Sequence, residues 1–291
     1  MSGARRQLEF VQYGNAEGRL VVYFHGVPGG VEECAVFDTH AKAHGLKIIC
    51  FDRLAIDPSM DREAYYQFLA DQIKLQAGRD PVDAIGFSIG AHVALEVSAR
   101  LGDQVRRLHL VSAAAPIIDL DSLREMAGGD VFRLAMNRPV AFYLVTQGQR
   151  LIAHVAPGLL IKTMFASARG NDEALASQES FKHYITPIIR DCFRNRVKGY
   201  MRDVRHYAAW RSFGGCASSV HLWHGEEDNW SPLSMASYLL TAIPSAVHLE
   251  SMVGLSHYSC LLTGVPEICS QLGSPSGRAK SGSKDSAATQ L

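Results

Sequence analysis

The sequence predicts an α/β protein in which a mostly parallel sheet is flanked by helices and interrupted by an inserted helical cap. Nearly continuous apolar runs at Leu46–Phe51, Val82–Phe87 and Arg107–Ser112 are typical of parallel strands that are buried on both faces. Between the first two runs, the apolar residues of segment 64–76 recur every three or four positions, which indicates a helix. Strand alternating with helix favours a parallel sheet, and the loss of strand signals over 117–212 favours an insertion.

The composition argues for a substantial core and against several classes of protein. The chain has 291 residues, of which 47% are hydrophobic, and its 29 basic side chains are balanced by 29 acidic ones. A balanced charge gives no reason to expect nucleic acid or an anionic membrane, so the expected partner is a small-molecule substrate. Residues 1–9 lack the apolar stretch of a secretory signal, and no later run of about 18 apolar residues is present to span a bilayer. The six cysteines form no C-x-x-C pair, and we therefore expect a cytoplasmic protein.

Further strand signals occur near the N-terminus and after the predicted insertion. The runs Leu8–Tyr13 and Leu20–Phe24 are separated by a turn-forming segment at 14–18, and this pattern predicts a hairpin at the start of the sheet. After the insertion, strand character returns at Val220–Trp223 and at Ala246–Glu250. The sheet is therefore expected to resume behind the cap.

The insertion and the C-terminal tail define the expected domain organisation. Within the insertion, Thr186 followed by Pro187 predicts a helix start. We expect that helix to continue to Trp210, with Gly199 as its weak point. The tail has no aromatic residue and is rich in Ser, Gly, Lys and Ala, so it is expected to be disordered. The expected parts are a core at 1–116 and 213–272, a helical cap at 117–212 and a disordered tail at 273–291.

A G-x-S-x-G motif occupies the junction between a predicted strand and a predicted helix. Gly86 and Gly90 flank Ser88, directly after the strand that ends at Phe87. A serine that exposes its hydroxyl on so tight a turn adopts a strained backbone, and side chains two residues before and after it would collide with their surroundings. The amide of Ile89 and the positive end of the helix then face the place where an oxyanion would form. The pattern predicts that Ser88 is a nucleophile.

A serine hydroxyl needs a base to take its proton, and the base in turn needs a carboxylate to orient it. His257 follows the last predicted strand, and Asp228 follows the strand before it. Both loops are expected to return to the carboxyl edge of the sheet, where Ser88 also lies. We therefore predict Ser88, Asp228 and His257 as the catalytic residues.

These motifs together resemble those of the α/β-hydrolase superfamily with a helical cap, over roughly 20–262. In chain order the matching pieces are HGVPG at 25–29, FDR at 51–53, GFSIG at 86–90, GEED at 225–228 and GLSH at 254–257. The resemblance implies the chain order Ser88, Asp228 and His257 for nucleophile, acid and base. Some relatives with this fold take their acid from an earlier position, which makes Asp119 the alternative acid.

The resemblance also implies an oxyanion hole formed by two backbone amides. The amide of Val27, which follows His25 and Gly26, would join that of Ile89. The residues that would support the elbow and the loop are His25, Gly26, Gly86 and Gly90.

We therefore expect a cofactor-independent serine hydrolase that cleaves a small to medium carboxylic ester through an acyl-enzyme intermediate, in the manner of a carboxylesterase. A first alternative is that the same residues hydrolyse a carbon–carbon bond or transfer the acyl group to another acceptor. A second is a non-catalytic ligand-binding protein on a hydrolase core. No metal is expected, because His40 and His44 lie one helical turn apart without an H-E-x-x-H motif or an identifiable third ligand.

Overall fold

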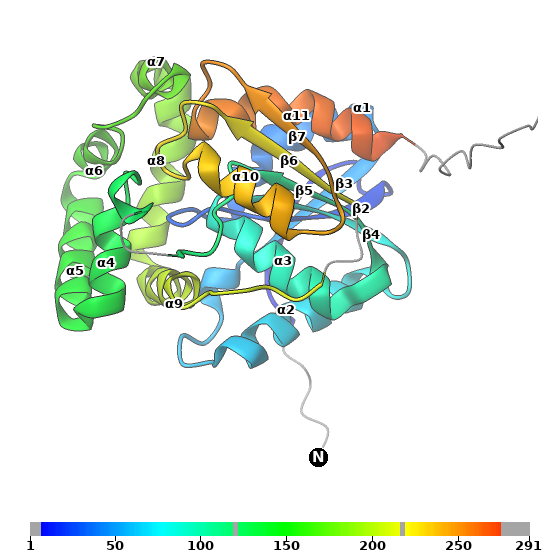
Figure 1. The fold of residues 1–291 in the computed structure, drawn as a ribbon, viewed down its shortest axis with the longest axis horizontal. Coiled ribbons are helices and arrows are strands. Elements are labelled where there is room, and N and C mark those ends of the chain that lie inside the picture. Colours follow the sequence, from blue (N-terminus) through cyan, green and yellow to red (C-terminus); the bar gives the residue numbers. More distant parts are fainter. Residues whose placement is uncertain (1–6, 119–121, 216–218, 275–291) are drawn as a thin grey trace, which may run out of the picture.

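A mostly parallel sheet forms the centre of the protein (Figure 1). The computed structural model describes residues 7–118, 122–215 and 219–274 of the 291-residue chain. The strands of this described part are β1 (Phe10–Gly14), β2 (Arg19–Phe24), β3 (Leu46–Phe51), β4 (Val82–Phe87), β5 (Val105–Val111), β6 (Ser219–Gly225) and β7 (Ala246–Met252). Their order is β1-β3-β2-β4-β5-β6-β7, and all neighbouring pairs are parallel except β1 with β3. The predicted α/β class with a mostly parallel sheet is confirmed.

The predicted hairpin between the first two strands is wrong. β1 pairs with β3 in antiparallel orientation, and β3 lies between β1 and β2 in the sheet. The turn after β1 also binds to the start of β3: the N–H of Asn15 donates to the carbonyl of Leu46 at 2.8 Å, and the N–H of Arg19 donates to the carbonyl of Gly45 at 2.9 Å. A turn signal predicts that the chain reverses, but it does not decide which strand lies alongside after the reversal.

Helices cover both faces of the sheet. α1 (Asp38–Ala43) and α11 (His257–Gly273) pack together on one face, and α2 (Arg62–Ala77), α3 (Ile89–Leu101) and α10 (Leu233–Ala242) lie on the other (Figure 1). The helix predicted over 64–76 corresponds to α2. Among the described helices, none has both the length and the apolar character that crossing a bilayer requires. The tail predicted to be disordered, at 273–291, lies outside the described residues from position 275 onward.

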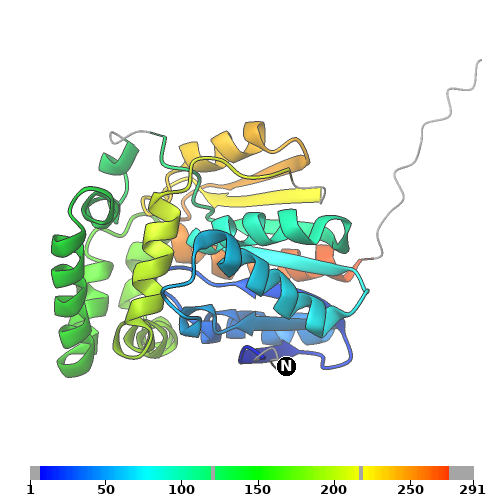
Figure 2. The same cartoon turned by 90° about the horizontal axis from the view of Figure 1, so that it is seen from below.

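Between β5 and β6, the described residues form six α-helices that gather at one end of the sheet (Figures 1 and 2). They are α4 (Gly129–Asn137), α5 (Pro139–Val155), α6 (Pro157–Met164), α7 (Asn171–Ser177), α8 (Glu179–Arg194) and α9 (Val197–Ala208). We call them the insert helices. Their buried side chains, such as Phe132 and Phe193, belong to the same hydrophobic cluster as Phe87 of the sheet. The division into a core at 1–116 and 213–272 and a separate cap at 117–212 stays a prediction.

The predicted helix start at Pro187 is wrong. α8 begins at Glu179, so Pro187 lies inside it. The apolar face continues across the proline, from the buried Phe181 to the buried Ile189. A proline inside a helix removes one hydrogen bond, and burial of this face offsets the loss.

The predicted continuity of that helix to Trp210 is also wrong. α8 ends at Arg194, and α9 begins at Val197. Gly199 is not a weak point, because it lies within α9 where a Cβ atom would overlap the carbonyl oxygen of Leu54. The missing side chain lets α9 approach the loop after β3.

Candidate active site

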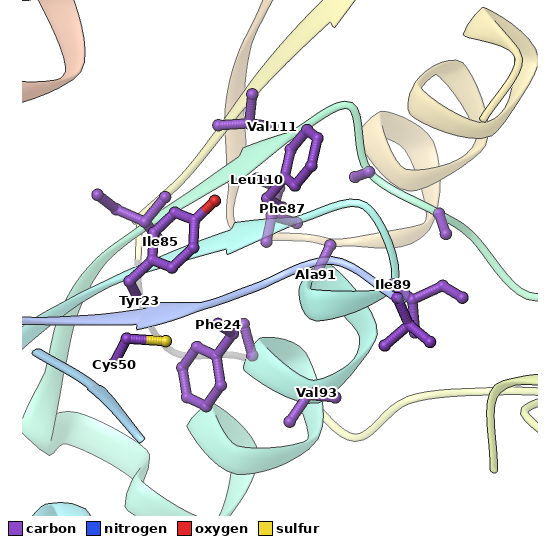
Figure 3. Packing of buried hydrophobic residues seen from close by; sticks show 14 of the residues in the cluster. Tyr23, Phe24, Cys50, Ile85, Phe87, Ile89, Ala91, Val93, Leu110 and Val111 are labelled. Carbon is purple, nitrogen blue, oxygen red and sulfur yellow. The ribbon is translucent and has the colours of Figure 1, made fainter. Parts of the chain in front are cut away.

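Ser88 lies on a sharp turn between β4 and α3. Its φ of 56° and ψ of −127° form a conformation that a residue with a side chain adopts only under strain. A Cβ atom on Gly86 would lie 2.7 Å from Cα of Ala91, and one on Gly90 would overlap the carbonyl oxygen of Phe24. Figure 3 shows Ala91 and Phe24 among the buried side chains around this turn. The two glycines are thus needed for a turn this tight.

Asp228 and His257 meet at the carboxyl ends of β6 and β7. Asp228 lies in the loop after β6, and His257 is the first residue of α11. The Nδ1 atom of His257 lies 2.8 Å from Oδ2 of Asp228, and both side chains are buried. The other carboxylate oxygen, Oδ1, accepts hydrogen bonds from the N–H groups of Trp230 and Ser231 at 2.8 and 2.9 Å. With both oxygens bound, the carboxylate is held facing the imidazole.

The imidazole of His257 also lies beside the turn that carries Ser88. Its ring packs against Phe87, the residue before Ser88, with the ring centroids 4.8 Å apart. The indole of Trp230 stacks on its ring at 5.6 Å and an interplanar angle of 17°. In the described part of the chain, no hydrogen bond joins the Ser88 hydroxyl to this imidazole; such bonds often tighten only when substrate binds. The three residues predicted for catalysis therefore gather at one edge of the sheet.

Opposite charges on Asp228 and His257 stabilise each other. Burial alone lowers the pKa of an imidazole, but the charge of Asp228 and its hydrogen bond outweigh burial and raise the pKa of His257 above its ordinary value. Burial alone raises the pKa of a carboxyl group, yet the charge and hydrogen bond of His257 hold the pKa of Asp228 below its ordinary value. The pair therefore favours a carboxylate beside an imidazole that readily accepts a proton.

The two residues whose amides were predicted to form an oxyanion hole line the same cavity as Ser88. Val27 and Ile89 both line that cavity, and among the described residues neither N–H donates a hydrogen bond to the protein. Ile89 is the first residue of α3, so its N–H has no acceptor within the helix. Val27 and Ile89 thus line the cavity of Ser88 with N–H groups that have no acceptor within the described part of the chain.

The loop after β2 is anchored by the buried Arg53 of the FDR motif and by two buried carboxylates, Glu33 and Asp203, that no sequence pattern indicated. The guanidinium of Arg53 donates a hydrogen bond to the carbonyl oxygen of His25 at 2.6 Å and forms an ion pair with Asp203 of α9. The N–H of Gly26 donates to Oε1 of Glu33 at 2.7 Å. No motif marks Glu33 or Asp203, because an isolated acidic residue in a sequence gives no sign that it will be buried.

The cavity beside Ser88 has a volume of about 310 Å³ and is mostly apolar. None of the described side chains that line it is charged. Its main apolar side chains come from the insert helices and the segment before them: Met126, Val131, Phe132, Ile152, Leu160, Met164, Phe193 and Val204. Gln149 and Tyr200 add polar groups to this wall. The arrangement can enclose an uncharged group attached to an atom held at Ser88.

Two other expectations concern the alternative acid and metal ions. Asp119, the alternative acid, lies outside the described residues, and Asp228 is the carboxylate that contacts His257. Over residues 7–118, 122–215 and 219–274, no three His, Cys, Asp or Glu side chains gather as metal ligands would.

Comparisons with known proteins agree with this architecture. The family described as the alpha/beta hydrolase fold matches residues 19–261. A comparison with curated proteins finds no match. Among solved structures, the chain is similar to a thermophilic esterase from Thermogutta terrifontis, with a TM-score of 0.62, 16% identity, and 91% of this chain and 90% of that chain covered. It is also similar to a bromoperoxidase from Bacillus anthracis, with a TM-score of 0.61, 17% identity, and coverage of 90% and 92%. A third similar structure is an enol-lactonase from Burkholderia xenovorans, with a TM-score of 0.60 and 13% identity. The match covers 91% of this chain and 94% of that chain.

Proposed function

The chain belongs to the alpha/beta hydrolase fold family, and we propose that it is a cofactor-independent serine hydrolase that cleaves a small to medium carboxylic ester through an acyl-enzyme intermediate. One observation carries the proposal. The buried pair of Asp228 and His257, with 2.8 Å between Oδ2 and Nδ1, lies beside the strained turn that holds Ser88. Such a set converts a weak hydroxyl nucleophile into a reactive one.

The reaction would begin with attack of the Ser88 hydroxyl oxygen on the acyl carbonyl carbon. His257 would take the hydroxyl proton on Nε2, while Asp228 holds the Nδ1 side and stabilises the imidazolium. The amides of Val27 and Ile89 would donate hydrogen bonds to the oxyanion, and each such donor is worth a factor of about 10² to 10³ in rate. His257 would then protonate the alcohol oxygen as its bond to the acyl carbon breaks, which leaves the acyl group on Ser88. In the second half, His257 would take a proton from water as the water oxygen attacks the acyl carbon. It would return this proton to the Ser88 oxygen as the acid leaves.

The size and the uncharged lining of the cavity favour a substrate that places an uncharged acyl or alkyl group in it. A volume of about 310 Å³ lies at the lower end of the range typical of small-molecule sites. An ionised substrate group would lose its hydration there without meeting an opposite charge, which is costly. Two of the similar structures, named an esterase and an enol-lactonase, are consistent with ester chemistry on this fold.

A fluorophosphonate probe tests the nucleophile directly. We expect the probe to label the native chain at Ser88, as located by mass spectrometry of the peptide. Ser88→Ala is expected to lose labelling and to lower the hydrolysis of p-nitrophenyl butyrate by about 10⁴-fold or more. Cys260→Ser, a change of a buried residue that does not line the cavity, serves as the control and should label normally. Labelling elsewhere, or hydrolysis by Ser88→Ala within a few-fold of the parent, would show the covalent mechanism to be wrong.

A further inference from the structure

A carboxylate of the insert helices reaches the first turn of the helix that carries His257. Asp172, in α7, is fully buried. Its Oδ2 accepts a hydrogen bond from the N–H of Tyr258 at 2.9 Å, and its Oδ1 accepts one from the N–H of Ser259 at 2.7 Å. These two amides directly follow His257 in α11. Amides in a first helical turn have no acceptor within their own helix, and a negative charge is favourable at that end.

The residues next to Asp172 hold the preceding loop as well. The N–H of Asn171 donates to the carbonyl oxygen of Gly254 at 2.9 Å. Gly170 adopts a φ of +51°, and a Cβ atom there would lie 2.7 Å from the same carbonyl oxygen and 2.8 Å from Cβ of Glu227. The segment 170–172 therefore contacts both the loop before His257 and the residue before Asp228.

α11 also has an N-terminal cap of its own. Ser256 and Ser259 already form a reciprocal capping box, in which the N–H of Ser256 donates to the hydroxyl of Ser259 at 2.8 Å. This box provides acceptors for the N–H groups of Ser256 and Ser259. Asp172 is thus a second acceptor for the Ser259 N–H and the acceptor for the Tyr258 N–H, and it places a buried charge next to His257.

We propose that Asp172 is a positioning residue that fixes His257 for proton transfer, an inference that rests on the proposed function. By holding the two peptide groups after His257, Asp172 sets the direction in which the imidazole leaves the backbone. The imidazole must satisfy two partners in one plane, the Asp228 carboxylate on Nδ1 and the Ser88 hydroxyl on Nε2, so small rotations of the backbone are damaging.

The charge of Asp172 has a second effect that separates positioning from mere packing. Its negative charge adds to that of Asp228 in raising the pKa of His257. Removal of the charge should therefore move the acid limb of the rate profile to lower pH, because the imidazole then loses its proton at lower pH. A residue that only stabilised the fold would lower the melting temperature without moving this limb.

The decisive variant is Asp172→Asn, which keeps the size of the side chain and removes its charge. We expect kcat for p-nitrophenyl butyrate to fall by about 10- to 100-fold, the range for small misplacements of a catalytic group, with KM within about twofold. The acid limb of kcat/KM should move to lower pH. Labelling of Ser88 by the fluorophosphonate should slow in proportion to kcat. Asp172→Glu, which restores the charge, should return the acid limb toward its original position.

Asp61→Asn is the matched control. Asp61 also accepts a backbone N–H at a helix start, from Ala64 of α2 at 2.9 Å, and it does not line the cavity. Its kcat and pH profile should stay within about twofold of the parent. NMR titration of the His257 ring protons gives a readout without substrate: its pKa should fall in Asp172→Asn and not in Asp61→Asn. A folded Asp172→Asn protein with an unchanged kcat and an unchanged His257 titration would overturn the inference. A native chain that neither hydrolyses esters nor reacts with the probe would instead reject the proposed function.

Discussion

The Nδ1 atom of His257 lies 2.8 Å from Oδ2 of Asp228, in a position from which solvent is excluded on both sides of the contact. The negative charge of Asp228 and its hydrogen bond raise the pKa of His257 despite the burial of the imidazole. The imidazolium therefore persists to a higher pH than in a free peptide. A general base must be neutral to act, so activity should fall as the pH drops through this raised pKa.

Asp228→Asn tests this relationship. We expect kcat/KM to fall by about 10⁴-fold at neutral pH, since an amide fixes the wrong imidazole tautomer and does not stabilise the imidazolium. In the residual activity, the acid limb should lie at lower pH than in the parent. The measurement is the pH dependence of kcat/KM between pH 5 and about 9. An unchanged acid limb would mean that another group provides the base.

Glu33→Gln should stabilise the protein in alkaline solution. Burial raises the pKa of Glu33 from 4.5 to about 7, and Oε2 has no partner among the described residues. Between those two values the folded chain binds a proton that the unfolded chain has lost, so the Glu33 contribution to the free energy of unfolding decreases as the pH rises from 4.5 through 7. At pH 8 the variant should exceed the parent in this free energy by about 1 to 3 kcal/mol.

Urea unfolding at several pH values measures this difference. The gap between Glu33→Gln and the parent should grow from pH 4.5 to 8, because only the parent carries the ionisable group. The hydrogen bond from the Gly26 N–H to Oε1 can be kept by the amide oxygen. A gap that stays constant across this range would contradict the expected titration.

Ile152→Trp should shorten the acyl groups that the protein accepts. Ile152 of α5 lines the cavity, whereas its neighbour Leu151 is 62% exposed and does not. We expect kcat/KM for a p-nitrophenyl octanoate to fall about tenfold or more, since a filled pocket excludes the methylenes that fitted it. The acetate ester should react within about twofold of the parent rate.

Leu151→Trp is the matched control for this experiment. It adds the same ring one position away on the solvent side, so kcat/KM for both esters should stay close to the parent values. If Ile152→Trp slowed acetate and octanoate equally, the cavity would not be the site that holds the acyl chain.

Local sequence patterns were sufficient for the features that depend on short stretches of chain. The motif GFSIG at 86–90 marks the turn at Ser88, where Gly86 avoids a clash with Ala91 and Gly90 avoids one with Phe24 of β2. The buried strands are recognisable from their apolar composition. The positions of Asp228 and His257 followed from their places after successive strands. These features are recognisable because each carries its own short pattern, and the parallel sheet brings the ends of successive strands to one edge.

The features that the sequence did not predict depend on distant contacts. β1 pairs with β3, which begins 32 residues after the end of β1 at Gly14, rather than with its neighbour in sequence, β2. The course of α8 through Pro187 depends on burial of its face against other helices. Glu33 and Asp172 lie in ordinary sequence surroundings, and only the fold places them against Gly26 and the start of α11.

The uncharged lining of the cavity bears on how a catalytic cycle would end. Hydrolysis of a neutral ester yields an acid that ionises at neutral pH, and the described walls hold no cation to keep that anion. The newly formed carboxylate would regain its hydration only by leaving. Product departure would thus be driven by the reaction itself, and added carboxylic acids should be poor inhibitors compared with uncharged molecules of the same shape.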